Sequence, residues 1–221
     1  MIRLRSSMTA MGVVLAMFTA AANADGIAAA GRAGTLGIGA ELTKGFTETV
    51  NGRFGFNNYT FDKSGAKDGV NYDIDMELEN LGAFVDWHPF RGGFRTTAGV
   101  VHNGNGATLK AQAAATYEIG GATYTGGQVG ELSGNLEFDT ISPYVGVGWG
   151  NAVDNKGRWT FGLDLGALFQ GNADLQLSAS GTATTSPTFQ SDLETERKRA
   201  QDDLSALEVY PVVQAGLAYR F

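Results

Sequence analysis

The sequence of 221 residues contains no cysteine, only four prolines and only two histidines. Without cysteine the chain can form neither a disulfide nor a thiolate metal site. Its 23 acidic residues outnumber the 16 basic ones, which argues against nucleic acid as a partner. Beyond residue 24, glycine, asparagine, glutamine or threonine interrupts every apolar stretch, so a membrane-spanning helix is not expected. If the chain enters a membrane, it therefore does so as β-strands.

The N-terminus has the pattern of a secretory signal. Arg3 and Arg5 precede a short apolar stretch, and Ala22-Asn23-Ala24 is a small-x-small cleavage site. We predict a cleaved signal peptide over residues 1–24 and one β-barrel domain over residues 25–221. Cleavage leaves 14 basic against 23 acidic residues, so the net charge changes from −7 to −9.

Apolar residues alternate with small or polar ones in segments of about ten residues along nearly the whole remaining chain. The clearest segment places Trp159, Phe161 and Leu163 on one face and Thr160, Gly162 and Asp164 on the other. This period is typical of a strand with one face on lipid and the other on a polar lumen. The sequence therefore predicts an all-β fold, an antiparallel transmembrane β-barrel.

Seven strands are clear, but antiparallel bacterial barrels close with an even number, so we predict eight. The eighth is either residues 25–34 or part of residues 173–184. Near Asn80 the alternation shifts by one residue, which predicts a β-bulge. Ser191 and Glu194 match a capping box, and we expect a short amphipathic helix over residues 191–206, before the last strand and resting on the barrel rim.

All three tryptophans, Trp87, Trp149 and Trp159, adjoin short connections at residues 88–93 and 151–157. Amphipathic rings gather where lipid headgroups meet water. The sequence therefore predicts an aromatic girdle at the end of the barrel that carries the short turns.

Inward charges predict a lumen charge network of Glu41, Arg53, Glu79, Asp86 and Arg95. A tight turn after Asp86 places it across from Arg95, and neighbouring strands bring Arg53 near Glu41 or Glu79. Unpaired charges in a narrow interior are costly, so we expect these residues to pair and close the lumen. On this basis Arg53→Ala is expected to raise conductance from near zero.

In the predicted strand at residues 72–79 a row of acids alternates with apolar residues and is expected to face the lumen: Asp73, Asp75, Glu77 and Glu79. A solvated lumen wall is the preferred interpretation, and a divalent metal site is the alternative.

Two features resemble known barrels. The ending Ala218-Tyr219-Arg220-Phe221 is similar to the C-terminal assembly signal of outer-membrane proteins, in which Tyr219 and Phe221 would be read by the barrel assembly machinery. The runs from Asp86 to Phe90 and from Pro143 to Gly150 resemble a largely uncharacterised family of small proteobacterial outer-membrane proteins, grouped with the OmpA membrane domain and OmpW barrels. The resemblance implies outer-membrane location and carries no catalytic residue.

The two histidines allow an enzymatic alternative to be weighed. His88 lies in a predicted turn, where a structural role is expected. Lipid A deacylase barrels place a serine shortly after a histidine, but His102 is followed by Asn103, Gly104 and Asn105.

We therefore expect a non-enzymatic outer-membrane barrel with a structural or surface-interaction role, without cofactor or metal. Its partners would be outer-membrane lipid and lipopolysaccharide. The alternatives are a narrow porin-like channel for small or hydrophobic solutes and a lipid-modifying enzyme.

Overall fold

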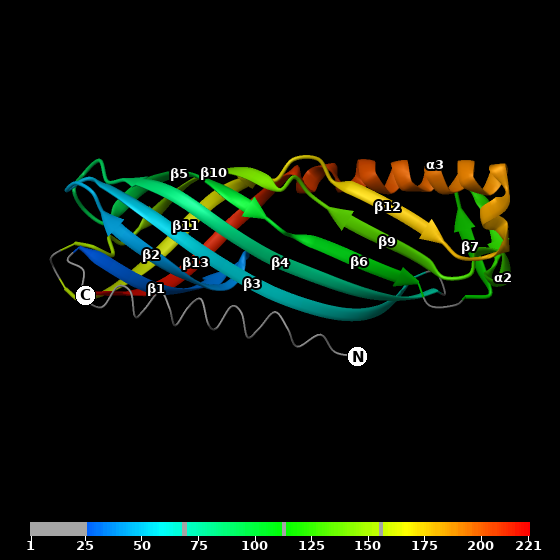
Figure 1. Ribbon diagram of the computed structural model, residues 1–221, viewed down its shortest axis with the longest axis horizontal. Coiled ribbons are helices and arrows are strands. Elements are labelled where there is room, and N and C mark those ends of the chain that lie inside the picture. The colour runs from blue at the N-terminus through cyan, green and yellow to red at the C-terminus, as the bar shows by residue number, and fades with distance from the viewer. Residues whose placement is uncertain (1–25, 68–69, 112–113, 155–156) are drawn as a thin grey trace.

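The computed structural model describes residues 26–67, 70–111, 114–154 and 157–221. The predicted signal peptide lies outside these residues. Within them, no helix is both long and apolar enough to cross a membrane. The chain forms a β-barrel that continues at one end into an extension of strands and helices (Figure 1).

The barrel wall is closed by antiparallel pairing of β1 with β13 and of β4 with β5. Its eight strands are β1 (Ile27–Gly34), β2 (Gly37–Gly45), β3 (Val50–Lys67), β4 (Val70–Trp87), β5 (Phe94–Asn103), β10 (Ile141–Trp149), β11 (Trp159–Phe169) and β13 (Val209–Arg220). The predicted eight-stranded fold is confirmed, and the eighth strand is β1. The other candidate segment contains β12, which pairs with β9 outside the barrel.

The two faces of the wall differ as the alternation predicted. On β11, Phe161 is 66% exposed on the outside, whereas Asp164 is 3% exposed on the inside. Outward positions of other strands repeat the pattern with large apolar side chains: Ile38, Phe54, Val85, Val100, Val145, Val213 and Leu217. Such a band is the surface that a transmembrane barrel presents to lipid.

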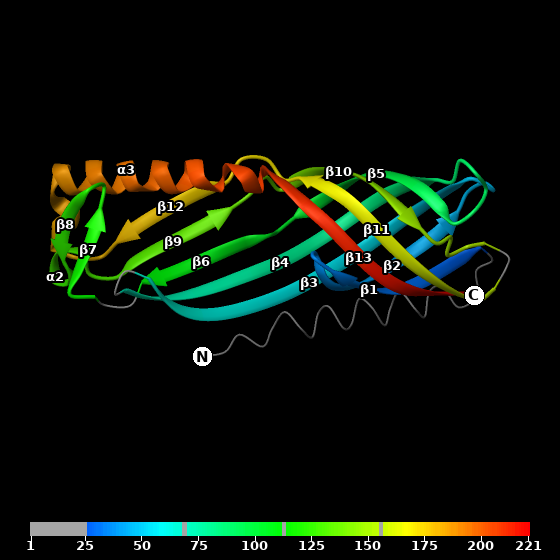
Figure 2. The same ribbon diagram turned by 180° about the vertical axis from the view of Figure 1, so that it is seen from behind.

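The extension grows from β3 and β4, which are 18 residues long and run past the end of the barrel. There they continue a sheet in the order β3-β4-β6-β9-β12, with β6 (Gly106–Ala111), β9 (Leu132–Glu137) and β12 (Asp174–Ala179). The remaining elements are the hairpin β7 (Thr116–Ile119) and β8 (Ala122–Thr125), the helices α2 (Gly126–Val129) and α3 (Pro187–Asp203), and the 3-10 turns η1 (Thr182–Thr185) and η2 (Leu204–Glu208). In both views α3 runs beside β12, with β7 and α2 at the far end (Figures 1 and 2).

The predicted bulge near Asn80 is wrong, because β3 and β4 keep one register from Val50 opposite Trp87 to Lys67 opposite Val70. The alternation shifts because the surroundings change. Beside the barrel the outward face is apolar, whereas in the extension the outward face is polar. The acids Asp75, Glu77 and Glu79 are consequently exposed on the outer face, and the predicted acidic lumen wall is a wrong assignment.

The helix begins earlier than predicted. Ser186 precedes its first turn and Pro187 occupies the first position, where the missing N–H costs no hydrogen bond. The supposed cap at Ser191 lies inside the helix. Phe189 and Leu193 are buried in a core at the far end of the extension, so α3 packs on the extension rather than on the barrel rim.

Candidate functional site

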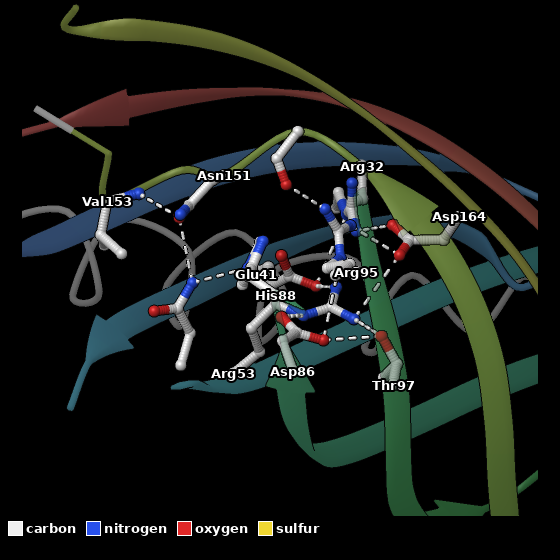
Figure 3. Close-up of polar contacts among 12 residues, drawn as sticks. Arg32, Glu41, Arg53, Asp86, His88, Arg95, Thr97, Asn151, Val153 and Asp164 are labelled. Atoms are coloured by element: carbon white, nitrogen blue, oxygen red, sulfur yellow. Dashed lines mark hydrogen bonds and ion pairs between the residues drawn. The ribbon is translucent and has the colours of Figure 1, made fainter. Parts of the chain in front are cut away.

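Six charged side chains from six strands meet inside the barrel near the end with the short turns (Figure 3). Each is at most 7% exposed. They are the bases Arg32 (β1), Arg53 (β3) and Arg95 (β5) and the acids Glu41 (β2), Asp86 (β4) and Asp164 (β11). Three positive and three negative charges balance, as burial away from water requires.

Arg53 is the centre of this lumen charge network. Its Nη1 donates to Oε2 of Glu41 at 2.8 Å, and its Nε lies 2.5 Å from Oδ2 of Asp86. Its Nη2 lies 3.5 Å from Oδ1 of Asp164. The guanidinium carbon also stands 5.3 Å from the ring centre of Phe84, within the range of a cation–π contact. One side chain thus touches three acids and an aromatic face.

Asp164 is the second centre. It accepts a hydrogen bond from Arg32, and Nη2 of Arg95 donates to its Oδ1 at 2.6 Å. Arg95 also donates to the carbonyl of Gly150 and lies 3.7 Å from Asp86. Because most residues here have two partners, removing one disturbs several pairs.

The structure brings four of the five predicted network residues together: Glu41, Arg53, Asp86 and Arg95. Glu79 is not among them, since it points to the opposite face of β4 and forms no ion pair with any residue that the structure describes. Sequence reasoning missed Arg32 and Asp164. The alternation predicted that Asp164 faces inward but indicated no partner for it. Arg32 lies in residues 25–34, one of the two candidates for the eighth strand.

Between the network and the short turns, hydrogen bonds close the end of the barrel. His88, 1% exposed, lies 2.9 Å through Nδ1 from the carbonyl of Gly92, and Nε2 lies 3.1 Å from the amide nitrogen of Asn51. An imidazole that donates through Nδ1 can accept through Nε2, which matches both contacts. Asn51 also donates to Asn151, so His88 ties two short turns together (Figure 3).

Aromatic and apolar side chains close the lumen on the other side of the network. Phe84 and Tyr144 pack edge to face with their ring centres 5.2 Å apart. A Cβ at Gly166 would lie 2.4 Å from the Tyr144 hydroxyl, so a residue without a side chain is needed opposite this ring. Tyr144 packs in a buried cluster with Leu36, Val101, Leu168 and Val212.

Little space remains between these layers. Two cavities of about 20 Å³ each adjoin the network, one toward His88 and one toward Tyr144. Each has room for about one water molecule. The barrel interior is therefore filled by side chains.

Comparison with known proteins shows the same fold. No protein-family model and no curated protein matches the chain. Among solved structures, CarO2 of Acinetobacter baumannii matches with a TM-score of 0.60 at 23% identity over 88% of this chain and 98% of that one. CarO of the same organism matches with a TM-score of 0.57 at 21% identity over 88% and 97%. The chain shares its fold with both. The finer resemblance to the OmpA and OmpW barrels stays a prediction.

The short-turn end of this fold carries the tryptophans. Trp87 ends β4, Trp149 ends β10 and Trp159 begins β11, and their exposed fractions are 55%, 46% and 64%. The ring of Tyr219 lies 4.9 Å from that of Trp159, and the N–H of Phe221 donates to the carbonyl of Ile27 at 3.1 Å. The C-terminal residues therefore lie at the same end as the tryptophans and also join the last strand to the first.

Proposed function

We propose that this chain is a non-enzymatic barrel of the Gram-negative outer membrane that does not conduct solutes and serves a structural or surface-interaction role. The apolar outer band and the aromatic residues at one end support a membrane location. Its partners in this proposal are outer-membrane lipid and lipopolysaccharide, and Tyr219 and Phe221 serve recognition by the barrel assembly machinery.

The filled interior is the observation that carries the proposal. The lumen charge network spans the barrel, and the cluster around Tyr144 and Leu168 closes it again. A porin-like channel needs a continuous water path, and two separate cavities of about 20 Å³ do not provide one. The narrow-channel alternative would therefore require both layers to open.

The enzymatic alternative depends on His102. This residue is exposed on the outer face of β5. Within the described part of the chain, it makes no hydrogen bond to a serine or a carboxylate. Among the described residues, the pair of nucleophile and base that acyl transfer requires is therefore not assembled around His102.

Single-channel recording of the refolded full barrel in planar bilayers tests the proposal. We expect no steady conductance for the wild type. Arg53→Ala alone should also stay closed, because the Tyr144 cluster remains; this revises the expectation that the network alone seals the lumen. A variant with Arg53→Ala, Tyr144→Ala and Leu168→Ala should conduct, provided that it still shows the mobility of a folded barrel on unheated gels. Steady conductance of the wild type would favour the channel.

A further inference from the structure

The sheet of the extension has one apolar and one polar face. Its apolar face continues the inward face of the barrel wall, and its polar face continues the outward face, which in the barrel is apolar. Ile74, Leu109 and Leu177 are aligned across β4, β6 and β12 on the face turned toward α3. Between them the other face presents Asp75 and Thr108. Outside lipid, an apolar sheet face is stable only when something covers it.

Helix α3 and the β7–β8 hairpin cover this face in part. At the far end, Phe189, Ile119 and Val129 are at most 1% exposed and form a closed core. Beside this core, between the hairpin, the sheet and the second half of α3, lies a cavity of about 920 Å³. Its walls are mostly apolar: Ile74, Ala107, Leu109, Leu136, Leu175 and Leu177 on the sheet side, facing Ala200 and Leu204. This volume is typical of a small-molecule site.

Charges on the lining select among hydrophobic ligands. Three acids, Glu118, Glu196 and Asp203, line the cavity together with one base, Arg199. The lining therefore carries a net charge of −2. The opposite face of the sheet is also net negative, with the acids Asp75, Glu77 and Glu137 against the one base Lys110. A negative potential at the entrance of an apolar cavity attracts cations and repels anions.

We propose that this cavity binds a hydrophobic cation, a small molecule with an apolar body and one positive charge. The body would lie between the sheet and α3, and the charge would lie near Glu196 and Asp203. This site specifies the proposed surface role, but it lies outside the barrel. Its test does not depend on whether the lumen conducts.

A fluorescence titration of the full barrel in lipid nanodiscs tests this site. Because the sequence has no cysteine, Thr123→Cys on the cavity lining can carry one polarity-sensitive dye. The probes are tetraphenylphosphonium and tetraphenylborate, which have similar shape and opposite charge. We expect a saturable dye response to the phosphonium ion and a weaker, non-saturable one to the borate ion.

Two matched pairs of variants locate the response. Ala107→Trp fills the cavity from β6 and should abolish saturation, whereas Thr108→Trp, the next residue on the opposite face, should not. Asp203→Asn should weaken phosphonium binding about two- to five-fold, as expected for one exposed charge. Asp202→Asn, the adjacent acid outside the lining, should leave binding unchanged.

Three outcomes would overturn the proposal. A response that Ala107→Trp leaves intact would show that the dye reports partition into lipid. Saturable binding of tetraphenylborate with equal or higher affinity would contradict the charge selection. Equal effects of Asp203→Asn and Asp202→Asn would remove the lining acid from the site. Conductance recordings remain a separate measurement, so failure here leaves the closed-barrel proposal standing.

Discussion

Removal of Arg53 should destabilise the barrel far more than removal of an exposed arginine. In Arg53→Ala, Glu41, Asp86 and Asp164 lose contacts at 2.8, 2.5 and 3.5 Å. Two arginines then face three buried acids, so one negative charge is uncompensated. Breaking a buried pair from one side costs about 3–5 kcal/mol. We expect a loss of that size in the free energy of unfolding.

Urea unfolding of the refolded protein in lipid vesicles, followed by tryptophan fluorescence, measures this loss. The matched control is Arg91→Ala, which removes an ion pair with Glu48 at 3.3 Å. The two side chains are 74% and 79% exposed, so this substitution should cost at most about 1 kcal/mol. Adding Glu41→Gln to Arg53→Ala restores neutrality and should recover at least about 1 kcal/mol. Equal costs for the two single variants, or no recovery in the double variant, would refute the argument that charge balance in the lumen stabilises the barrel.

Three further predictions concern the rest of the molecule. Single-tryptophan variants should all be quenched best by labels at one shallow depth of the bilayer, and protection of any one of the three rings would contradict the girdle. Deletion of Phe221 should lower the outer-membrane yield in cells more than it lowers stability in vitro, and an unchanged yield would count against an assembly signal. The hydrogen bonds of Arg197 lower the pKa of Glu194 from 4.5 to about 2. The stabilisation of α3 by this ion pair is therefore present above pH 4.5 and is lost as the pH falls to about 2. Hydrogen exchange should show α3 opening in that range, and Glu194→Gln should remove the pH dependence.

The barrel was predictable because lipid outside and a narrow polar interior inside impose a strict period of two. Large outward side chains on β11 and inward glycines followed from that rule alone. Strand β1 was harder to find, since after Ile27 its outward positions are glycine and alanine rather than large apolar residues. For the same reason Arg32 was missed, although the alternation of Ala28, Ala30 and Arg32 on the buried side was available as a signal.

The extension was beyond sequence reasoning because its strands are short and pair across long separations. Strand β6 lies between β4 and β9, and β12 joins this sheet some forty residues after β9 begins. Local patterns contain no information about such pairing. The helix start was misplaced for a different reason. Ser191 and Glu194 satisfy the capping-box spacing, but Pro187 already provides a first helical position one turn earlier.

The shift in alternation at Asn80 has a physical meaning that a bulge would have hidden. Strands β3 and β4 run without interruption through both parts of the molecule, so inward and outward faces keep their identity along their length. What changes is the character of the outward side chains, from apolar at Leu81 and Val85 to charged at Glu79 and Glu77. The reversal therefore marks where the apolar band ends, within about one strand residue. Because the same hydrogen-bonded ladder crosses that boundary, the barrel itself fixes the position of the extension and its cavity relative to the apolar band.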